Sequence, residues 1–278
     1  MVKELIKQSA IILSMLLLIF VIGCTERNGS EFLRSSEIEK KTSDFPPIIE
    51  IKIREALADT ESPLSDEDLK KIESINLEGI SDPIDLSSLT RLENLESIHL
   101  SHVKVMSYDF IYNMQHLSSL HLEGVSLKEL PDFSKIHLQS LTITDSDIET
   151  LDFISNWDSL VTLELSSSQL TTLEGIQNAK KLKNLLISYN PVSDISQIKE
   201  LINLERIELK STQVQDITIL QEQQNLKLLD IRDTSVDTVS FLANLPELKI
   251  LLVTKDNIKD LDHIGDSVQV SETNILAY

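Results

Sequence analysis

Three groups of residues in this chain could do chemistry, each of a different kind. Cys24 is the only cysteine among 278 residues, so it cannot form a disulfide within the chain and its thiol is left for modification. His99 and His121 occupy equivalent places in neighbouring repeated segments, with His102 and Glu123 nearby, and two such imidazoles could ligate a metal. A third group, near the C-terminus, mixes charged and aliphatic side chains, as protein interfaces do.

The residues before Cys24 predict a lipid attachment. Lys3 and Lys7 precede an apolar run, 10–22, that would reach only about 20 Å as a helix, less than the hydrocarbon core of a membrane. This is the layout of a secretory signal peptide. The stretch "VIGC" resembles the lipobox of bacterial lipoproteins. The resemblance implies cleavage before Cys24, acyl chains such as palmitate on that cysteine, and a lipid-anchored protein on the extracytoplasmic face of a bacterial membrane. The alternative is an ordinary signal peptide with a chance cysteine.

Composition and charge exclude several classes of protein. The net charge is −20, which disfavours binding to nucleic acid and to anionic lipid head groups. A hydrophobic content of 41% excludes global disorder, and because only one Trp, four Tyr and seven Phe are present, the core must be aliphatic. We find no nucleophile elbow, zinc-protease helix, phosphate loop or dinucleotide fingerprint, so we expect no enzyme and no cofactor.

A repeated frame, LxxLxxLxL, organises most of the chain. It occurs as "LENLESIHL" from Leu92, "WDSLVTLEL" from Trp157 and "LINLERIEL" from Leu201, among other copies. Its closing residues alternate with period 2, which predicts a short strand, and wider apolar spacing follows, which predicts a turn or short helix. The strand pairs fall at Ile75/Leu77, Ile98/Leu100, Leu120/Leu122, Leu141/Ile143, Leu163/Leu165, Leu185/Ile187, Ile207/Leu209, Leu229/Ile231 and Leu251/Val253.

These intervals of 21 to 23 residues resemble the leucine-rich repeats of internalin-like bacterial surface proteins. The resemblance implies an α/β fold: a leucine-rich-repeat solenoid with a parallel concave sheet, short helical or turn segments on the convex side and an N-terminal helical cap. We divide the chain into the signal peptide (1–23), the lipidated cysteine and a flexible tether (24–44), the helical cap (45–72), the solenoid (73–264), and a terminal strand with a C-terminal cap (265–278).

Both ends of the repeats carry further patterns. Ile49, Ile53 and Leu57 have helical spacing, and Ser65 with Asp68 forms a capping-box pattern for a second short helix. At the other end "VQVSETNI" aligns with "LLVTKDNI", which predicts a last strand at Val268–Val270.

One turn position departs from the internalin-like pattern. The third residue after each strand pair, usually Asn in the family, is Val103 and Val125 in two early repeats and Asn190 in a central one. Asn, and in part Ser or Thr, can bond to buried backbone groups, and Val cannot. The early repeats should therefore be built differently or be looser.

The concave face should carry any binding site. In its N-terminal sector we expect His99 and His121 to be a solvated pair with no bound metal; shared metal ligation is the alternative. In its C-terminal sector, cations interrupt an acidic surface beside exposed aliphatic side chains, an arrangement typical of an interface. Our candidate partner-binding residues are Tyr189, Arg206, Glu208, Lys210, Leu228, Asp230, Arg232, Ile250 and Leu252. The alternative is that the C-terminal tail covers these aliphatics.

The function predicted from the sequence is that of a monomeric cell-surface lipoprotein. Its concave face would bind a protein partner in adhesion, sensing or envelope assembly. Two alternatives remain at this stage: a structural spacer of the envelope without a specific ligand, and a metal-binding surface protein that uses His99 and His121.

Lipid attachment can be tested at the cysteine itself. Because the lipid would be bonded to the Cys24 sulfur, Cys24→Ala should abolish incorporation of labelled fatty acid and leave the precursor uncleaved. The measurement is metabolic labelling followed by detergent partitioning. A variant that still takes up the label would contradict the lipobox assignment.

Overall fold

The structure is a computed structural model that describes residues 44–58, 62–126, 130, 132–154 and 157–274. The predicted signal peptide, Cys24 and nearly all of the predicted tether lie outside these described residues. Within them, no helix has the length and apolar character needed to cross a membrane.

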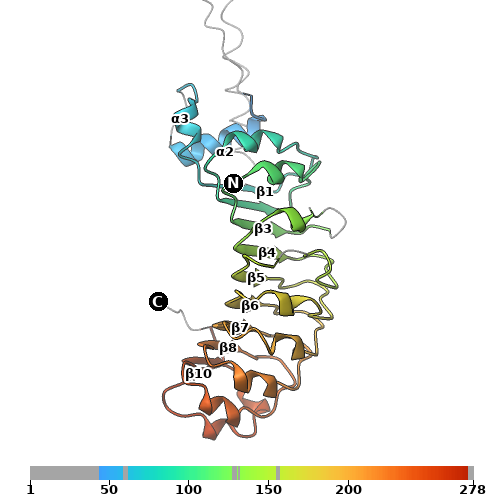
Figure 1. The fold of residues 1–278 in the computed structure, drawn as a ribbon, viewed down its shortest axis with the longest axis vertical. Helices are drawn as coiled ribbons and strands as arrows, with labels where there is room; N and C mark the ends of the chain where they lie inside the picture. The colour runs from blue at the N-terminus through green and yellow to red at the C-terminus, as the bar shows by residue number, and fades with distance from the viewer. Residues whose placement is uncertain (1–43, 59–61, 127–129, 131, 155–156, 275–278) are drawn as a thin grey trace, which may run out of the picture. The chain divides into compact units, whose positions relative to one another are not determined.

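Ten parallel strands form one sheet, in which each strand pairs with the next in sequence order (Figure 1). The predicted columns are confirmed, because Ile98 pairs with Leu120 and Ile207 pairs with Leu229 in direct register. The described residues thus form a leucine-rich-repeat solenoid. The strands are β1 (Ser74–Glu78), β2 (Ser97–Ser101), β3 (Ser119–Glu123), β4 (Ser140–Thr144), β5 (Thr162–Glu164), β6 (Asn184–Leu186), β7 (Arg206–Glu208), β8 (Leu228–Asp230), β9 (Ile250–Leu252) and β10 (Gln269–Ser271).

The return segments are 3₁₀ turns on the side opposite the strands, as Figure 1 shows. Their apolar residues and the strand pairs meet in one continuous aliphatic core, which also holds Trp157 at 4% exposure. We call the other side of the sheet the open face. The turns are η1 (Ser87–Arg91), η2 (Asp109–Asn113), η4 (Phe133–Lys135), η5 (Ile176–Asn178), η6 (Ser196–Ile198), η7 (Thr218–Glu222), η8 (Ser240–Asn244), η9 (Lys255–Asn257) and η10 (Leu261–His263).

Aspartates start several of these return segments. The carboxylates of Asp85, Asp194 and Asp216 each accept the backbone N–H two residues further on, at 2.8 Å in all three cases. This hydrogen bond lowers the pKa of each carboxyl group below its usual value. Part of the acidic composition therefore serves the turns of the solenoid.

A left-handed residue follows nearly every strand. After β1 and β3 this residue is a glycine, Gly79 or Gly124, and after six other strands it is not a glycine. Its backbone N–H reaches the next repeat, as in the bond from Tyr189 N to the Lys210 carbonyl at 2.7 Å. This link between repeats maintains a conformation that costs a non-glycine residue roughly 1 kcal/mol or more. The non-glycine members are His102, Asp145, Ser167, Tyr189, Ser211 and Asp233.

The early repeats differ from the later ones, as the valines predict. Val103 and Val125 are buried at the turn position, and the first four strands have five residues where β5 to β9 have three. Asn190, 3% exposed, instead donates from its amide to the carbonyls of Leu165 and Ile187 at 2.7 and 2.9 Å, and accepts from the backbone N–H of Leu170 at 3.0 Å. The Asn190 side chain thus bonds to backbone groups at the end of the short strands. In the early repeats, the longer strands pair such groups with each other.

The N-terminal cap matches the sequence pattern. Helix α2 (Pro47–Leu57) buries Ile49 and Ile53 completely, and Leu57 is partly buried against the same core. Helix α3 (Asp66–Leu69) begins at a full capping box, in which Ser65 and Asp68 each accept the other's backbone N–H. These helices continue the core beyond β1, so the first strand is not a bare apolar edge.

The last strand is displaced from its predicted position. β10 is Gln269–Ser271, and Val270 pairs with Leu251, whereas the sequence alignment placed Val268 there. The predicted register is therefore wrong by two residues. A slip of two preserves which side chains face the core, so alternation of apolar residues cannot distinguish the two registers.

Asn190 offers a test of how the turns are held. Asn190→Ala should lower the free energy of unfolding by about 2–3 kcal/mol, because it leaves buried backbone groups without partners. Asn203→Ala is the matched control: Asn203 also bonds to a carbonyl of the preceding repeat, that of Lys180 at 2.8 Å, but on the exposed surface. Urea denaturation measures both. Equal losses would contradict the role assigned to Asn190.

Candidate functional site

A hollow of about 680 Å³ lies on the open face over the central and C-terminal strands. Eight of the nine candidate partner-binding residues line it, and Ile250 is the exception. The sheet brings them together because residues at equivalent positions pair directly, as Arg206 does with Leu228 and Glu208 with Asp230. The candidate residues in the lining are Tyr189, Arg206, Glu208, Lys210, Leu228, Asp230, Arg232 and Leu252.

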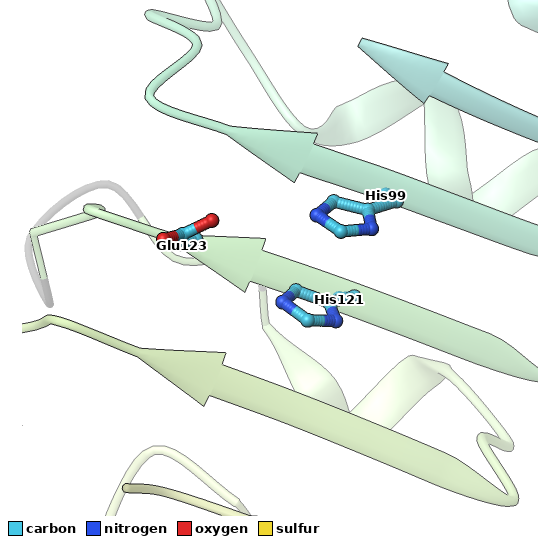
Figure 2. Close-up of side chains that lie close together, drawn as sticks. All are labelled: His99, His121 and Glu123. Atoms are coloured by element: carbon cyan, nitrogen blue, oxygen red, sulfur yellow. The ribbon is translucent and has the colours of Figure 1, made fainter. Parts of the chain in front are cut away.

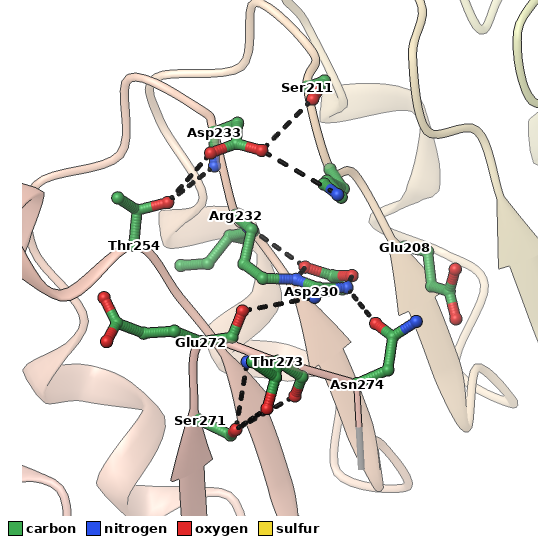
Figure 3. A network of polar contacts seen from close by, with 12 residues as sticks. Glu208, Ser211, Asp230, Arg232, Asp233, Thr254, Ser271, Glu272, Thr273 and Asn274 are labelled. Atoms are coloured by element: carbon green, nitrogen blue, oxygen red, sulfur yellow. Dashed lines mark hydrogen bonds and ion pairs between the residues drawn. The ribbon is translucent and has the colours of Figure 1, made fainter. Parts of the chain in front are cut away.

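Arg232 and Asp230 form a buried ion pair at the C-terminal end of the hollow (Figure 3). Asp230 is 2% exposed and Arg232 is 9% exposed. The Arg232 Nε donates to Asp230 Oδ1 at 2.9 Å, and its Nη2 donates to Oδ2 of the same carboxylate. The bidentate bond to Asp230 raises the pKa of Arg232. The pair is therefore a fixed part of the wall.

The C-terminal tail completes this pair. Arg232 also donates to the amide oxygen of Asn274 at 2.6 Å and to the carbonyl of Glu272 at 3.4 Å. Figure 3 shows both residues approaching Arg232 from the segment that follows β10. The expectation that Arg232 and Leu252 are exposed is wrong, since Leu252 is only 5% exposed. The alternative from the sequence placed the tail over the aliphatic side chains, and the hydrogen bonds of the tail reach a different candidate residue, Arg232.

Other charges of the hollow remain accessible at its edge. Arg206 is ion-paired with Glu208 from its own strand, and its side chain is 47% exposed. The ammonium of Lys210 lies 5.2 Å from the centre of the Tyr189 ring and 4.0 Å from Asp233. Tyr189 itself is 49% exposed. An exposed aromatic ring with a cation beside it can pack against an incoming chain.

Seven polar residues of the lining were not among the candidates, and two of them, Glu164 and Ser188, have unusual surroundings. Burial, and secondarily the charge of Glu208, raises the pKa of Glu164 above its usual value. Ser188 is 5% exposed, and its hydroxyl has no hydrogen-bond partner among the described residues. The alternation of side chains along β5, and along β6 and the residues just after it, placed both side chains near the open face. Sequence alone could not show which hydroxyl would lack a partner.

The histidine pair forms a second group, whose side chains are not part of the lining of the hollow. Figure 2 shows the two histidines with Glu123. His99 on β2 pairs with His121 on β3, and their rings stack with centroids 3.9 Å apart and planes at 10°. Glu123 comes near, as predicted, and its carboxylate accepts the hydroxyl of Ser101 at 2.6 Å. Burial lowers the pKa of His121, while the hydrogen bond from Ser101 lowers the pKa of Glu123. His102 is exposed and lies beyond the strand end.

Comparison with known proteins places the fold. No protein-family model matches the chain, and no curated protein matches it in sequence. Its structure is similar to an internalin C2 from Listeria monocytogenes, with a TM-score of 0.51 and 18% identity over 81% of this chain and 90% of that one. A leucine-rich-repeat protein of Leptospira interrogans gives a TM-score of 0.60 and 19% identity over 74% of this chain and 55% of that one. Both are bacterial leucine-rich-repeat proteins, as the repeat frame predicts.

The role of Arg232 can be tested by its effect on stability. Arg232→Ala should lower the free energy of unfolding by about 3–5 kcal/mol, because it leaves the Asp230 carboxylate buried without its partner. Arg206→Ala is the matched control, since it removes an exposed ion pair of the same kind and should cost less than about 1 kcal/mol. Thermal and urea unfolding measure both. If Arg232→Ala were as mild as the control, the buried pair would not be structural.

Proposed function

We propose that this chain is a lipid-anchored cell-surface protein that binds a protein partner in the hollow on its open face. The anchor rests on the "VIGC" stretch at Val21–Cys24 and its resemblance to a lipobox. The binding role rests on one observation: a hollow of about 680 Å³ gathers polar, charged, aromatic and aliphatic side chains from six successive repeats, from β4 to β9. The anchor would present this face outside the membrane.

The charges of the hollow favour a polar partner segment without a strong net charge. Arg206 is matched by Glu208, and Arg232 by Asp230, so the lining presents paired charges of both signs. A highly charged ligand would have to break one of these pairs. An uncharged, hydrogen-bonding stretch of polypeptide would leave both pairs in place.

Particular groups would make the contacts. The buried hydroxyl of Ser188 can donate to or accept from a partner group that enters the hollow. Tyr189 offers an aromatic surface at the edge, with Lys210 beside it. Because Tyr189 is the only candidate of the hydrophobic anchor type that is largely exposed, we expect a modest affinity, set mainly by hydrogen bonds.

We infer binding without catalysis. Among the described residues that line the hollow, both arginines are already ion-paired with a carboxylate of their own repeat. Glu164 has a raised pKa, but the hydroxyl of Ser188 has no basic partner that would activate it as a nucleophile. The lining therefore suits recognition of a surface better than turnover of a substrate.

The proposal is tested by cross-linking and then by affinity. A photoreactive amino acid replaces Tyr189 in the full chain on its native cells, and captured proteins are identified by mass spectrometry. With the purified partner, Tyr189→Ala should weaken binding about 30-fold, which corresponds to about 2 kcal/mol. Lys210→Ala should act mainly on the association rate.

Ser97→Ala and Ser119→Ala are the matched controls, on the open face at β2 and β3. Both should bind with unchanged affinity, and a photoreactive residue at position 119 should capture much less of the partner. Tyr189 already adopts a left-handed conformation, so replacing it with alanine adds no new backbone strain. Equal affinities for all four variants would remove the hollow as the interface.

A further inference from the structure

We propose that His99, His121 and Glu123 form a binding site for a divalent transition metal ion of the zinc type. The site lies on β2 and β3 of the open face, beside the N-terminal end of the hollow, since Glu123 pairs with Thr144 of its lining. It shares no residue with that lining and does not depend on the proposed protein-binding function. The sequence by itself led us to expect a solvated histidine pair. Two observations lead to a different conclusion: the geometry of the three donors, and a hydrogen bond from Ser101 that holds the Glu123 carboxylate.

The donor atoms are already close together. One ligand atom from each of the three residues lies within 4.8 Å of the other two. Figure 2 shows the two rings one above the other on adjacent strands, with the Glu123 carboxylate at the end of β3. All three side chains are partly buried, and their backbones are held by direct strand pairing of His99 with His121 and of Ser101 with Glu123. The approach of these groups is therefore built into the sheet.

Small movements would complete the coordination. Zinc bonds to nitrogen and carboxylate oxygen are about 2.0–2.2 Å long, so two donors to one ion lie at most roughly 4 Å apart. Donor atoms that are up to 4.8 Å apart therefore need to approach one another by about 1 Å. The lone pair of each imidazole lies in its ring plane, so rings that now stack at 10° must tilt toward a common point. These are side-chain rotations, and they leave the strands in place.

A hydrogen bond behind the carboxylate supports the assignment. Ser101 donates from its hydroxyl to Glu123 Oε2 at 2.6 Å, and the same hydroxyl lies 3.1 Å from His102 Nδ1. Groups of this kind orient the ligands of protein metal sites and tune their affinity. Three protein donors on an open face leave further coordination positions for water or for a donor from another molecule.

The chemistry of the donors selects the class of ion. Two imidazoles with one carboxylate suit zinc and neighbouring transition metals, whereas magnesium and calcium prefer oxygen ligands alone. A chain with a net charge of −20 also concentrates cations near its surface.

The test is zinc titration of the full chain in mild detergent, in a Cys24→Ala background so that the thiol cannot bind the metal. We expect one tight zinc ion per chain by calorimetry, displaced by nickel and not by millimolar magnesium. Zinc should shift the ring NMR signals of His99 and His121 as their stacking is lost. It should leave those of His263, an exposed histidine at the other end of the solenoid, unchanged.

Variants locate the site. His99→Ala and His121→Ala should each weaken zinc binding at least 100-fold, Glu123→Gln at least tenfold, and Ser101→Ala about tenfold. His116→Ala is the matched control, since His116 is an exposed histidine just before β3. The zinc affinity of this variant should stay within twofold of that of the unmodified chain. Melting curves without zinc check that each variant folds. Absence of tight binding, or equal affinities in His99→Ala and His116→Ala, would overturn the proposal.

Discussion

No repeat of this chain can bury its own apolar residues, and the rest of the structure depends on that constraint. The pair on each strand, such as Leu163 with Leu165, becomes fully buried only when a neighbouring repeat lies on either side. The same stacking sets strand beside strand in direct register and leaves one face of the sheet free of core residues. At the N-terminus, α2 takes over the role of a preceding repeat by burying Ile49 and Ile53.

Each stacked strand ends in a turn, and the backbone groups of that turn need hydrogen-bond partners. The repeats provide these partners in different ways. Where Val103 and Val125 stand at the turn, longer strands hold the backbone, and where Asn190 stands there, its amide does so. The left-handed position accepts glycine, serine, aspartate, histidine and tyrosine, because its backbone bond to the next repeat compensates for the local strain. At Tyr189 this turn also places an aromatic ring at the edge of the hollow. A structural requirement and a candidate binding feature thus meet in one residue.

The open face has three regions, which differ in the bonds that their side chains already make. Near the C-terminus, Asp230 and Arg232 neutralise each other, and the tail is fixed to them through Asn274. In the centre, Ser188 is buried and its hydroxyl has no hydrogen-bond partner among the described residues, while burial raises the pKa of Glu164. At β2 and β3 the histidines and Glu123 converge. We therefore propose two different ligands for this face: a polar polypeptide in the hollow and a metal ion at the histidines.

The sequence by itself determined the solenoid, its strand pairs, the capping box at Ser65 and the columns of the open face, because the spacing of leucines fixes which side chains must be buried together. It also brought His99 beside His121, since direct register follows from equivalent positions. Only the tertiary structure decided the register of β10, because a slip of two residues keeps the same side chains facing the core. It also decided that Arg232 is buried. Its partner Asn274 lies 42 residues away, beyond the last full repeat, and no periodic pattern relates the two positions.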